Sequence, residues 1–301
     1  MLKAYASLIG ATFIVGFSFA FVKISLDSAS VFESLAHRFS IAFLAVLILL
    51  KFGIISAKFS LQDLKQVAFI AALYPSSFFA FQAFGLVYTS SLMAGVLHAC
   101  TPIMTMIFAQ IFIKERTNLL QKLFILISVF GVVYILVMSG NLSANSSFLG
   151  NFLILLSVVA ISLYNVFTRK ILVKFEISKL VAIMVFIGFV FFNGLNLIDF
   201  ISSGRDLKLY FVPFLELKFS FAIAFLAIFS SVCTSFLFGY ALKHLEAFKV
   251  GIFSNLSTLI TIIAGVVLLD EKFEIYHFIG TILIILGVLG LNLSNLNRKQ
   301  E

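Results

Sequence analysis

A histidine and a proline lie close together inside one long apolar segment. His98 lies in SLMAGVLHACTPIMTMIFAQIFI, four residues before Pro102. Because histidine ionises near neutral pH, His98 is a candidate to bind a solute or carry a proton. Pro102 frees the backbone carbonyl of His98, and such interruptions often line transport paths. The alternatives are a histidine bonded to a neighbouring helix and a kink that serves only packing.

Further polar residues lie inside other apolar segments. They are Gln82, Tyr88, Tyr164, Asn165, Tyr240 and Asn255. Polar groups at membrane depth are costly, so we expect Gln82 and Asn165 to face protein or water rather than lipid. For each residue alone, hydrogen bonding between helices is the alternative to solute contact. Together with His98 and Pro102, this set is the predicted solute path.

Lys23 and Arg38 are the two basic residues of a candidate outer gate. Asp27 and Glu33 lie between them in the sequence. The alternative, which we expect, is that both long side chains extend to the membrane interface. We also expect Glu115 and Glu271 to be interface anchors at the ends of their helices. No Asp or Glu falls in the middle of an apolar segment, so the buried carboxylate relay of many proton-driven pumps is missing.

The composition identifies the solvent around these residues. Of 301 residues, 62% are hydrophobic and only 11% are charged, and the mean hydropathy is +1.16. Soluble proteins carry about 25% charged residues, so most of this surface must face lipid. The apolar runs do not alternate as barrel strands do, which indicates an all-α integral membrane protein. The net charge of +8 suits anionic lipid headgroups and requires no nucleic acid.

The sequence predicts ten membrane-spanning helices. They are placed at about 4–26, 32–51, 65–88, 91–113, 120–138, 149–168, 178–201, 220–242, 247–269 and 275–293. With the N-terminus inside, 15 of the 21 basic residues fall on the inner side. Because cytoplasmic loops are enriched in Lys and Arg, we expect a multi-pass protein of the cell (inner) membrane with both termini in the cytoplasm.

The second half of the sequence repeats the first. An offset of 156 residues pairs Glu115 with Glu271, and an offset of 146 nearer the N-terminus pairs Lys23 with Arg169. Each half holds five predicted helices, an odd number, so the halves would cross the membrane in opposite senses. We expect two inverted five-helix repeats, at 1–140 and 141–301. Coincidental similarity among apolar helices, or a duplication without a transport role, is the alternative.

These residues carry a resemblance to a known family. Residues 89–138 resemble the second half of an EamA domain, with small residues, then Pro102, then Glu115-Arg116, then Gly131. The stretch GFSFAFVKISLDSASVFESLAHRF resembles the opening of that domain, and Glu271-Lys272 and Gly287 repeat the pattern in the second half. The chain is thus similar to the drug/metabolite transporter (DMT) superfamily. It departs from the pattern in lacking tryptophan and in having Thr258 where the first half has Pro102.

The resemblance implies a secondary transporter, and an exporter in particular, of a small organic metabolite, amino acid or drug-like solute. Alternating access would take place through a central cavity lined by helices one, three, four, six, eight and nine. A membrane-embedded enzyme or a channel is the alternative, although the four histidines are dispersed and no catalytic motif is visible. We expect no cofactor and no metal. The expected partners are the solute and the lipid bilayer.

The sequence is compatible with either a monomer or a homodimer. Gly280, Gly287 and Gly290 are spaced for close helix packing, either within one chain or between two. Cys100 and Cys233 lie in separate apolar runs and show neither a disulfide pattern nor ligand spacing.

Overall fold

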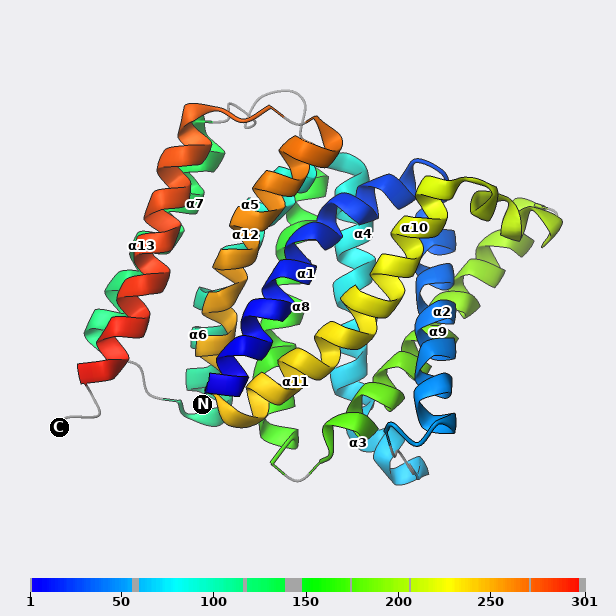
Figure 1. Cartoon of the computed structure of the whole chain (residues 1–301), viewed down its shortest axis with the longest axis horizontal. Helices are drawn as coiled ribbons and strands as arrows, with labels where there is room; N and C mark the ends of the chain where they lie inside the picture. Colours follow the sequence, from blue (N-terminus) through cyan, green and yellow to red (C-terminus); the bar gives the residue numbers. More distant parts are fainter. Residues whose placement is uncertain are drawn as a thin grey trace.

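The computed structural model describes residues 2–55, 60–115, 118–138, 148–173, 175–205, 207–270 and 272–297. Within these ranges the regular structure is helical (Figure 1). The helices of the first half are α1 (Leu2–Leu26), α2 (Val31–Lys51), α3 (Leu61–Ala71), η1 (Ala72–Ser77), α4 (Phe78–Tyr88), α5 (Ser91–His98), α6 (Thr101–Ile113) and α7 (Leu119–Met138). Those of the second half are α8 (Phe148–Ile171), α9 (Ile177–Ser203), η2 (Leu207–Leu215), α10 (Leu217–Phe225), η3 (Leu226–Cys233), α11 (Thr234–His244), α12 (Ala247–Leu269) and α13 (Ile275–Asn297).

Eight helical segments of the described chain are long and apolar enough to cross a membrane. They are Leu2–Leu26, Val31–Lys51, Leu61–Tyr88, Ser91–Ile113, Phe148–Ile171, Ile177–Ser203, Leu217–His244 and Lys249–Leu269. Leu119–Ile135 and Ile275–Gly287 are shorter apolar helices. The prediction of an all-helical, multi-pass membrane protein is confirmed.

Helices start and stop where local chemistry satisfies their end groups. Ser30 and Ser60 each accept a hydrogen bond from the backbone three residues later, and the acid at that position bonds back, which makes two capping boxes. α6 and α12 both end in a left-handed residue, Lys114 at φ 54° and Asp270 at φ 53°. These two residues are 156 positions apart, so the repeated charge clusters begin with the same backbone turn.

Two of the membrane-spanning segments are interrupted by wide helical turns near their middle. η1 separates α3 from α4, and η3 separates α10 from α11. In η1 the backbone of Tyr74 leaves the helical region, with φ −143° and ψ 119°, directly before Pro75. Turns of the π type are rare and occur often at functional sites, so these two interruptions mark a place to search for one.

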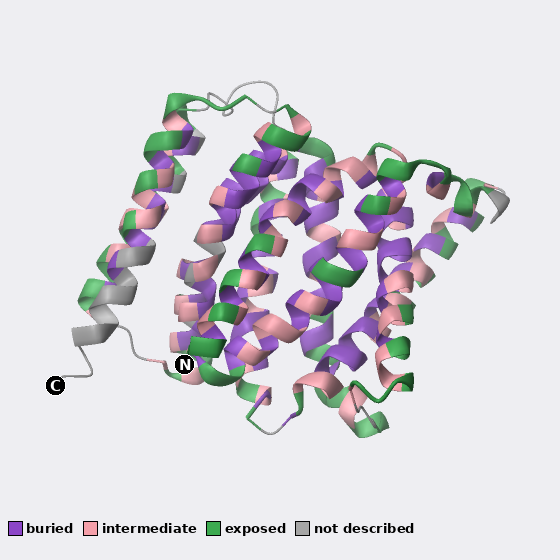
Figure 2. Ribbon diagram, viewed as in Figure 1, coloured by how far each residue is buried: buried purple, intermediate pink, exposed green. Residues whose placement is uncertain are grey.

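The helices pack as one bundle with a pair at its edge. α1 packs against α11 and α12, α2 against α9, and α4 against α8, so elements of the two halves interleave. Buried residues are concentrated in the middle of the bundle (Figure 2). α7 and α13 form the pair at the edge, and the start of α1 and the end of α13 lie at the same end of the molecule (Figure 1).

Glycines bring α7 and α13 into close contact within one chain. A Cβ atom on Gly287 would lie 2.6 Å from the carbonyl oxygen of Phe124, and one on Gly131 would lie 2.7 Å from that of Gly280. Small residues of this kind allow membrane helices to approach each other's backbone. The glycine spacing alone was compatible with packing within one chain or between two chains. At these contacts the glycines pack helices of the same chain.

We predict that Gly287→Ala destabilises the protein by about 1–3 kcal/mol, because the new methyl group forces α7 and α13 apart. The thermal unfolding midpoint of the purified protein in detergent should fall by several degrees. Gly194→Ala is the matched control, since a Cβ atom at Gly194 meets nothing within 4 Å. Equal midpoints for the two variants would contradict the packing argument.

Candidate functional site

A cavity of about 80 Å³ lies at the centre of the bundle. It is lined from α1, η1, α4, α5, α6, α8, η3, α11 and α12, which together cover the six segments expected to surround a solute path. The lining consists of Thr12, Val15, Ser18, Phe19, Tyr74, Phe78, Phe79, Gln82, His98, Thr101, Ile161, Tyr164, Asn165, Ser230, Thr234, Ser235, Phe238, Val250, Gly251, Phe253 and Ser257. Both wide turns, η1 and η3, contribute to it.

Most of the lining residues pair across the two sequence offsets. The offset of 156 relates Tyr74 to Ser230, Phe78 to Thr234, Phe79 to Ser235, Gln82 to Phe238 and Thr101 to Ser257, and the offset of 146 relates Val15 to Ile161, Ser18 to Tyr164 and Phe19 to Asn165. The positions correspond but the side chains differ. At two positions α4 has the rings of Phe78 and Phe79 where α11 has hydroxyl groups, and at a third α4 has Gln82 where α11 has Phe238, so the cavity is chemically asymmetric.

His98 lies on the cavity wall and also bonds to a neighbouring helix. Its side chain is 6% exposed, and its Nε2 atom lies 3.1 Å from the Oγ atom of Ser157 on α8. The Ser157 hydroxyl donates to the carbonyl of Ile154 at 2.7 Å. Since that hydroxyl has one proton, Nε2 of His98 must be the donor. The rings of Phe19 and Phe78 contact the imidazole by their edges.

Gln82 and Asn165 offer amide groups to the cavity. Both are buried, at 2% and 6% exposure, and both line the cavity. Neither side chain has a hydrogen-bond partner in the described part of the chain, yet neither amide is sealed away from the cavity space. A buried amide without a partner is costly, so these two groups are available to a polar ligand. Tyr164 lies beside Asn165 and lines the same cavity.

The remaining residues of the predicted path lie elsewhere. Pro102 is buried beside Gly251 and does not line the cavity, and the His98 carbonyl that it frees accepts a hydrogen bond from Thr101 Oγ1 at 2.6 Å. Tyr88 is 46% exposed at the end of α4. Tyr240 lines a separate shallow hollow beside Lys243. The side chain of Asn255 lies outside the described residues.

Arg38 differs from the expectation that it extends to the membrane interface. It is 1% exposed, because its Nε and Nη2 atoms donate to Ser231 Oγ at 2.8 Å and Ser230 Oγ at 3.0 Å. Its guanidinium carbon also lies 3.9 Å from the ring centre of Phe79. These groups of η3 and α4 replace water and hold the charge inside the bundle. Lys23 is partly buried in the last turn of α1.

Glu115 and Arg169 form a hydrogen-bonded ion pair at one end of the bundle. Arg169 Nε lies 2.6 Å from Glu115 Oε1, which also accepts from the backbone N–H of Ala247 at 3.2 Å. Arg169 Nη1 donates to the carbonyls of Leu242 and Leu245. This Glu115–Arg169 network links the ends of α6 and α8 to the turn between α11 and α12. Glu115 therefore bonds to other helices rather than lying free at the interface; Glu271 lies outside the described residues.

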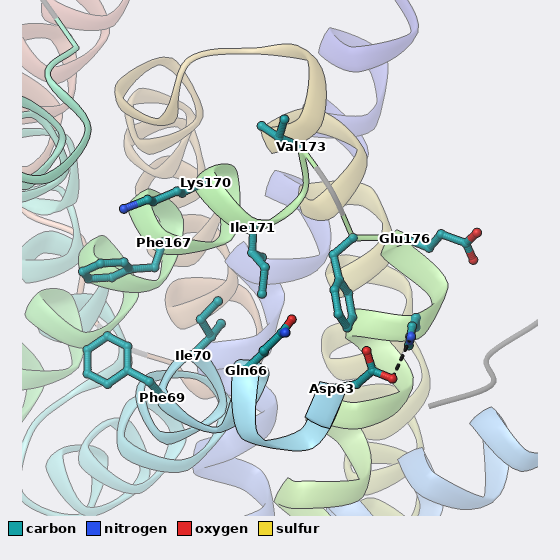
Figure 3. A pocket seen from close by; sticks show the side chains of 11 residues that line it. Asp63, Gln66, Phe69, Ile70, Phe167, Lys170, Ile171, Val173 and Glu176 are labelled. Carbon is teal, nitrogen blue, oxygen red and sulfur yellow. Dashed lines mark ion pairs between the residues drawn. The ribbon is translucent and has the colours of Figure 1, made fainter. Parts of the chain in front are cut away.

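A second, larger hollow of about 1090 Å³ lies between α3, the end of α8 and the start of α9 (Figure 3). Phe69, Ile70, Phe167 and Ile171 form apolar walls, and Lys170 and Glu176 lie at its rim. Asp63 pairs with Lys179 at 2.8 Å across it. This hollow is wide open, and the carboxylate of Asp63 is already paired with Lys179. The central cavity, with its inward-facing amides, is therefore the better candidate for a solute site.

Comparison with known proteins agrees with a transport role for the bundle. The EamA-like transporter family matches residues 2–137 and 148–293. The chain belongs to this family. Two proteins of Bacillus subtilis (strain 168) are similar to it: the uncharacterized transporter YcxC is 44% identical over 298 residues, covering 99% of this chain and 95% of YcxC, and the uncharacterized transporter YetK is 29% identical, covering 95% and 85%.

A solved crystal structure with 17% sequence identity has the same fold, with a TM-score of 0.72 over 99% of both chains. The family and these relatives identify a multi-pass membrane transporter and point away from an enzyme. The resemblance to the DMT superfamily, drawn from residues such as Glu115 and Gly131, is confirmed.

We predict that Ser157→Ala costs about 0.6 kcal/mol of stability, the average for a hydrogen bond between membrane helices. His98→Ala should cost more, because it also leaves a void between Phe19 and Phe78. Thermal unfolding of both single variants and the double variant in detergent measures the coupling. The double variant should lose less stability than the sum of the two single losses, and strict additivity would show that the contact contributes nothing.

Proposed function

We propose that this protein is a secondary transporter that moves a small organic solute through the central cavity by alternating access. The observation that carries the proposal is the cavity lining, in which residues from both halves meet at corresponding sequence positions. Transporters built from inverted repeats bind their solutes where the repeats meet, near the middle of the membrane. Inward-facing amides of Gln82 and Asn165 provide groups that a polar solute can bind.

We further propose that residues 1–140 and 141–301 are two inverted five-helix repeats. The two separate family matches, at 2–137 and 148–293, support this division. Wide turns in corresponding segments and the left-handed ends at Lys114 and Asp270 support it as well. The distribution of Lys and Arg favours a cytoplasmic position for both termini in the cell membrane, with the Glu115–Arg169 network at the cytoplasmic end.

The size of the cavity supports a mechanism that needs movement. Ligand sites usually measure about 300–1,000 Å³, so a cavity of about 80 Å³ must expand before it holds an organic solute. In the proposed cycle, breaking the Glu115–Arg169 network separates α6 and α8 and opens the cavity to the cytoplasm. Closing it permits opening on the other side. Export is the direction that the family resemblance favours.

We predict that Ser18→Phe abolishes transport, because the larger ring fills the cavity from α1. The assay reconstitutes the protein in liposomes, supplies a defined metabolite mixture outside, and measures uptake by mass spectrometry. Ala6→Phe is the matched control, since Ala6 is exposed on the same helix and should leave uptake unchanged. Uptake by Ser18→Phe at the rate of the unmodified protein would contradict a path through this cavity.

We predict that Glu115→Gln makes the cavity more accessible from the end that carries Lys114. The reporter is Val15→Cys, which lines the cavity, in a chain with Cys100 and Cys233 replaced by alanine. A membrane-impermeant thiol reagent applied to that side should label the reporter several-fold faster, since the neutral amide holds Arg169 less firmly.

Glu246→Gln is the control for this experiment. It breaks a local ion pair with Lys249 near the same end of the bundle, while the Glu115–Arg169 network stays intact. Labelling that is unchanged in Glu115→Gln, or equally increased in Glu246→Gln, would show that the network does not close the cavity.

A further inference from the structure

Arg38 is a buried cation without a matching acid. It is 1% exposed, and no carboxylate of a described residue lies within 4.0 Å of it. Among the described residues its Nη1 atom has no hydrogen-bond partner. Burying a charge in a membrane protein costs several kcal/mol, and charges that persist there commonly mark a solute or ion pathway. The described residues do not provide a counter-charge for Arg38, so a ligand is the group that could provide one.

Ser230 connects this cation to the cavity. Its Oγ atom accepts from Arg38 Nη2 at 3.0 Å, so its own proton stays available to donate, and its side chain lines the central cavity. A hydroxyl bonded to a guanidinium is a polarised donor, because hydrogen bonds in series strengthen one another. An anion in the cavity that accepts from Ser230 would be linked to the positive charge of Arg38 through one hydroxyl.

Ser231 provides an internal comparison. It also accepts from Arg38, at 2.8 Å, but its hydroxyl donates to the carbonyl of Leu226 at 3.0 Å and its side chain does not line the central cavity. The two neighbouring serines thus make the same kind of contact with Arg38. Only one of them faces the cavity space.

The rest of the cavity does not neutralise the charge. None of the residues that line it is Asp or Glu, and Phe79, which also lines it, covers the guanidinium at 3.9 Å. With few mobile water molecules in a cavity this small, the field of Arg38 acts there with little screening. That field favours an anionic group in the cavity and opposes a cationic one. The amides of Gln82 and Asn165 add neutral groups for the remainder of a ligand.

Building on the proposed transport function, we propose that the solute carries a carboxylate, which accepts a hydrogen bond from Ser230 and finds its counter-charge in Arg38. A single guanidinium balances one negative charge. A phosphate monoester carries about −1.5 to −2 at neutral pH and would leave an excess in a site without a second cation. A monocarboxylate is therefore the class of solute that this geometry fits.

The test compares acids with their own primary amides. Liposomes that contain the full-length protein are incubated with lactate and lactamide, 3-phenylpropionate and 3-phenylpropionamide, leucine, and choline as the cation, and their contents are measured by mass spectrometry. The variants are Arg38→Gln, Arg38→Lys, Ser230→Ala and Ser231→Ala. The same solutes are added to the purified unmodified protein and to Arg38→Gln, and the thermal unfolding midpoints are compared.

We expect uptake of carboxylates in preference to their amides and to choline. Ser230→Ala should raise the half-saturation concentration about tenfold, the effect of losing one hydrogen bond to a charged group, while Ser231→Ala changes it less than about twofold. Arg38→Gln should lose the preference for carboxylates and Arg38→Lys should keep it. If Arg38 only held η3 in place, both serine variants would be impaired alike, and that result would overturn the proposal.

Failure of the inference and failure of the transport proposal give different results. Uptake of amides or choline only, with no carboxylate, leaves transport standing and overturns the assignment of Arg38. If no solute enters, the transport proposal fails for these solutes, and the midpoints decide the inference. Carboxylates that stabilise the unmodified protein and not Arg38→Gln support it, and carboxylates that stabilise neither protein overturn it.

Discussion

The structure depends on the absence of water in the hydrocarbon layer, because a polar group that faces lipid there is left without a hydrogen-bond partner. Helices satisfy the backbone, and apolar side chains cover the outside. The remaining polar side chains are grouped, because burying them at one site costs less free energy than burying them at several separate sites. This constraint places Gln82, Asn165 and His98, which come from three different helices, around one small cavity. The candidate site is thus the place where polar side chains that lipid cannot solvate lie together.

Much of this could be predicted from the sequence, because depth in the membrane is readable from a position along an apolar segment. Gln82, His98, Tyr164 and Asn165 each lie at least six positions from the nearest end of their membrane-spanning segments, and all four line the cavity. Tyr88 and Tyr240 do not, because a tyrosine near a helix end can keep its ring in apolar surroundings and its hydroxyl in the interface. The membrane-spanning helices were visible for the same reason, since length and hydropathy alone define them.

Other features could not be predicted from single residues. Thr12 and Thr234 donate to backbone carbonyls of their own helices, so they cost little in any apolar segment and give no signal of a site. The sequence offsets would have found other lining residues, since the predicted Tyr164, Asn165 and Gln82 correspond to Ser18, Phe19 and Phe238. The burial of Arg38 depends on a wide turn in η3 that lies far away in the sequence. No local sequence pattern predicts that turn.

The pairing of positions and the divergence of side chains have separate consequences under the proposed mechanism. Matching backbone devices, such as the turns at Lys114 and Asp270, make the two ends of the bundle equivalent enough to open in alternation. Identical side chains in the cavity would also bind a solute equally well in two orientations. Because Phe79 on α4 corresponds to Ser235 on α11, and Gln82 on α4 corresponds to Phe238 on α11, the two walls place their polar and apolar groups at different positions. A solute with one polar end then has a single favourable orientation. The repeated backbone structure therefore permits the movement, and the differing side chains determine the selectivity.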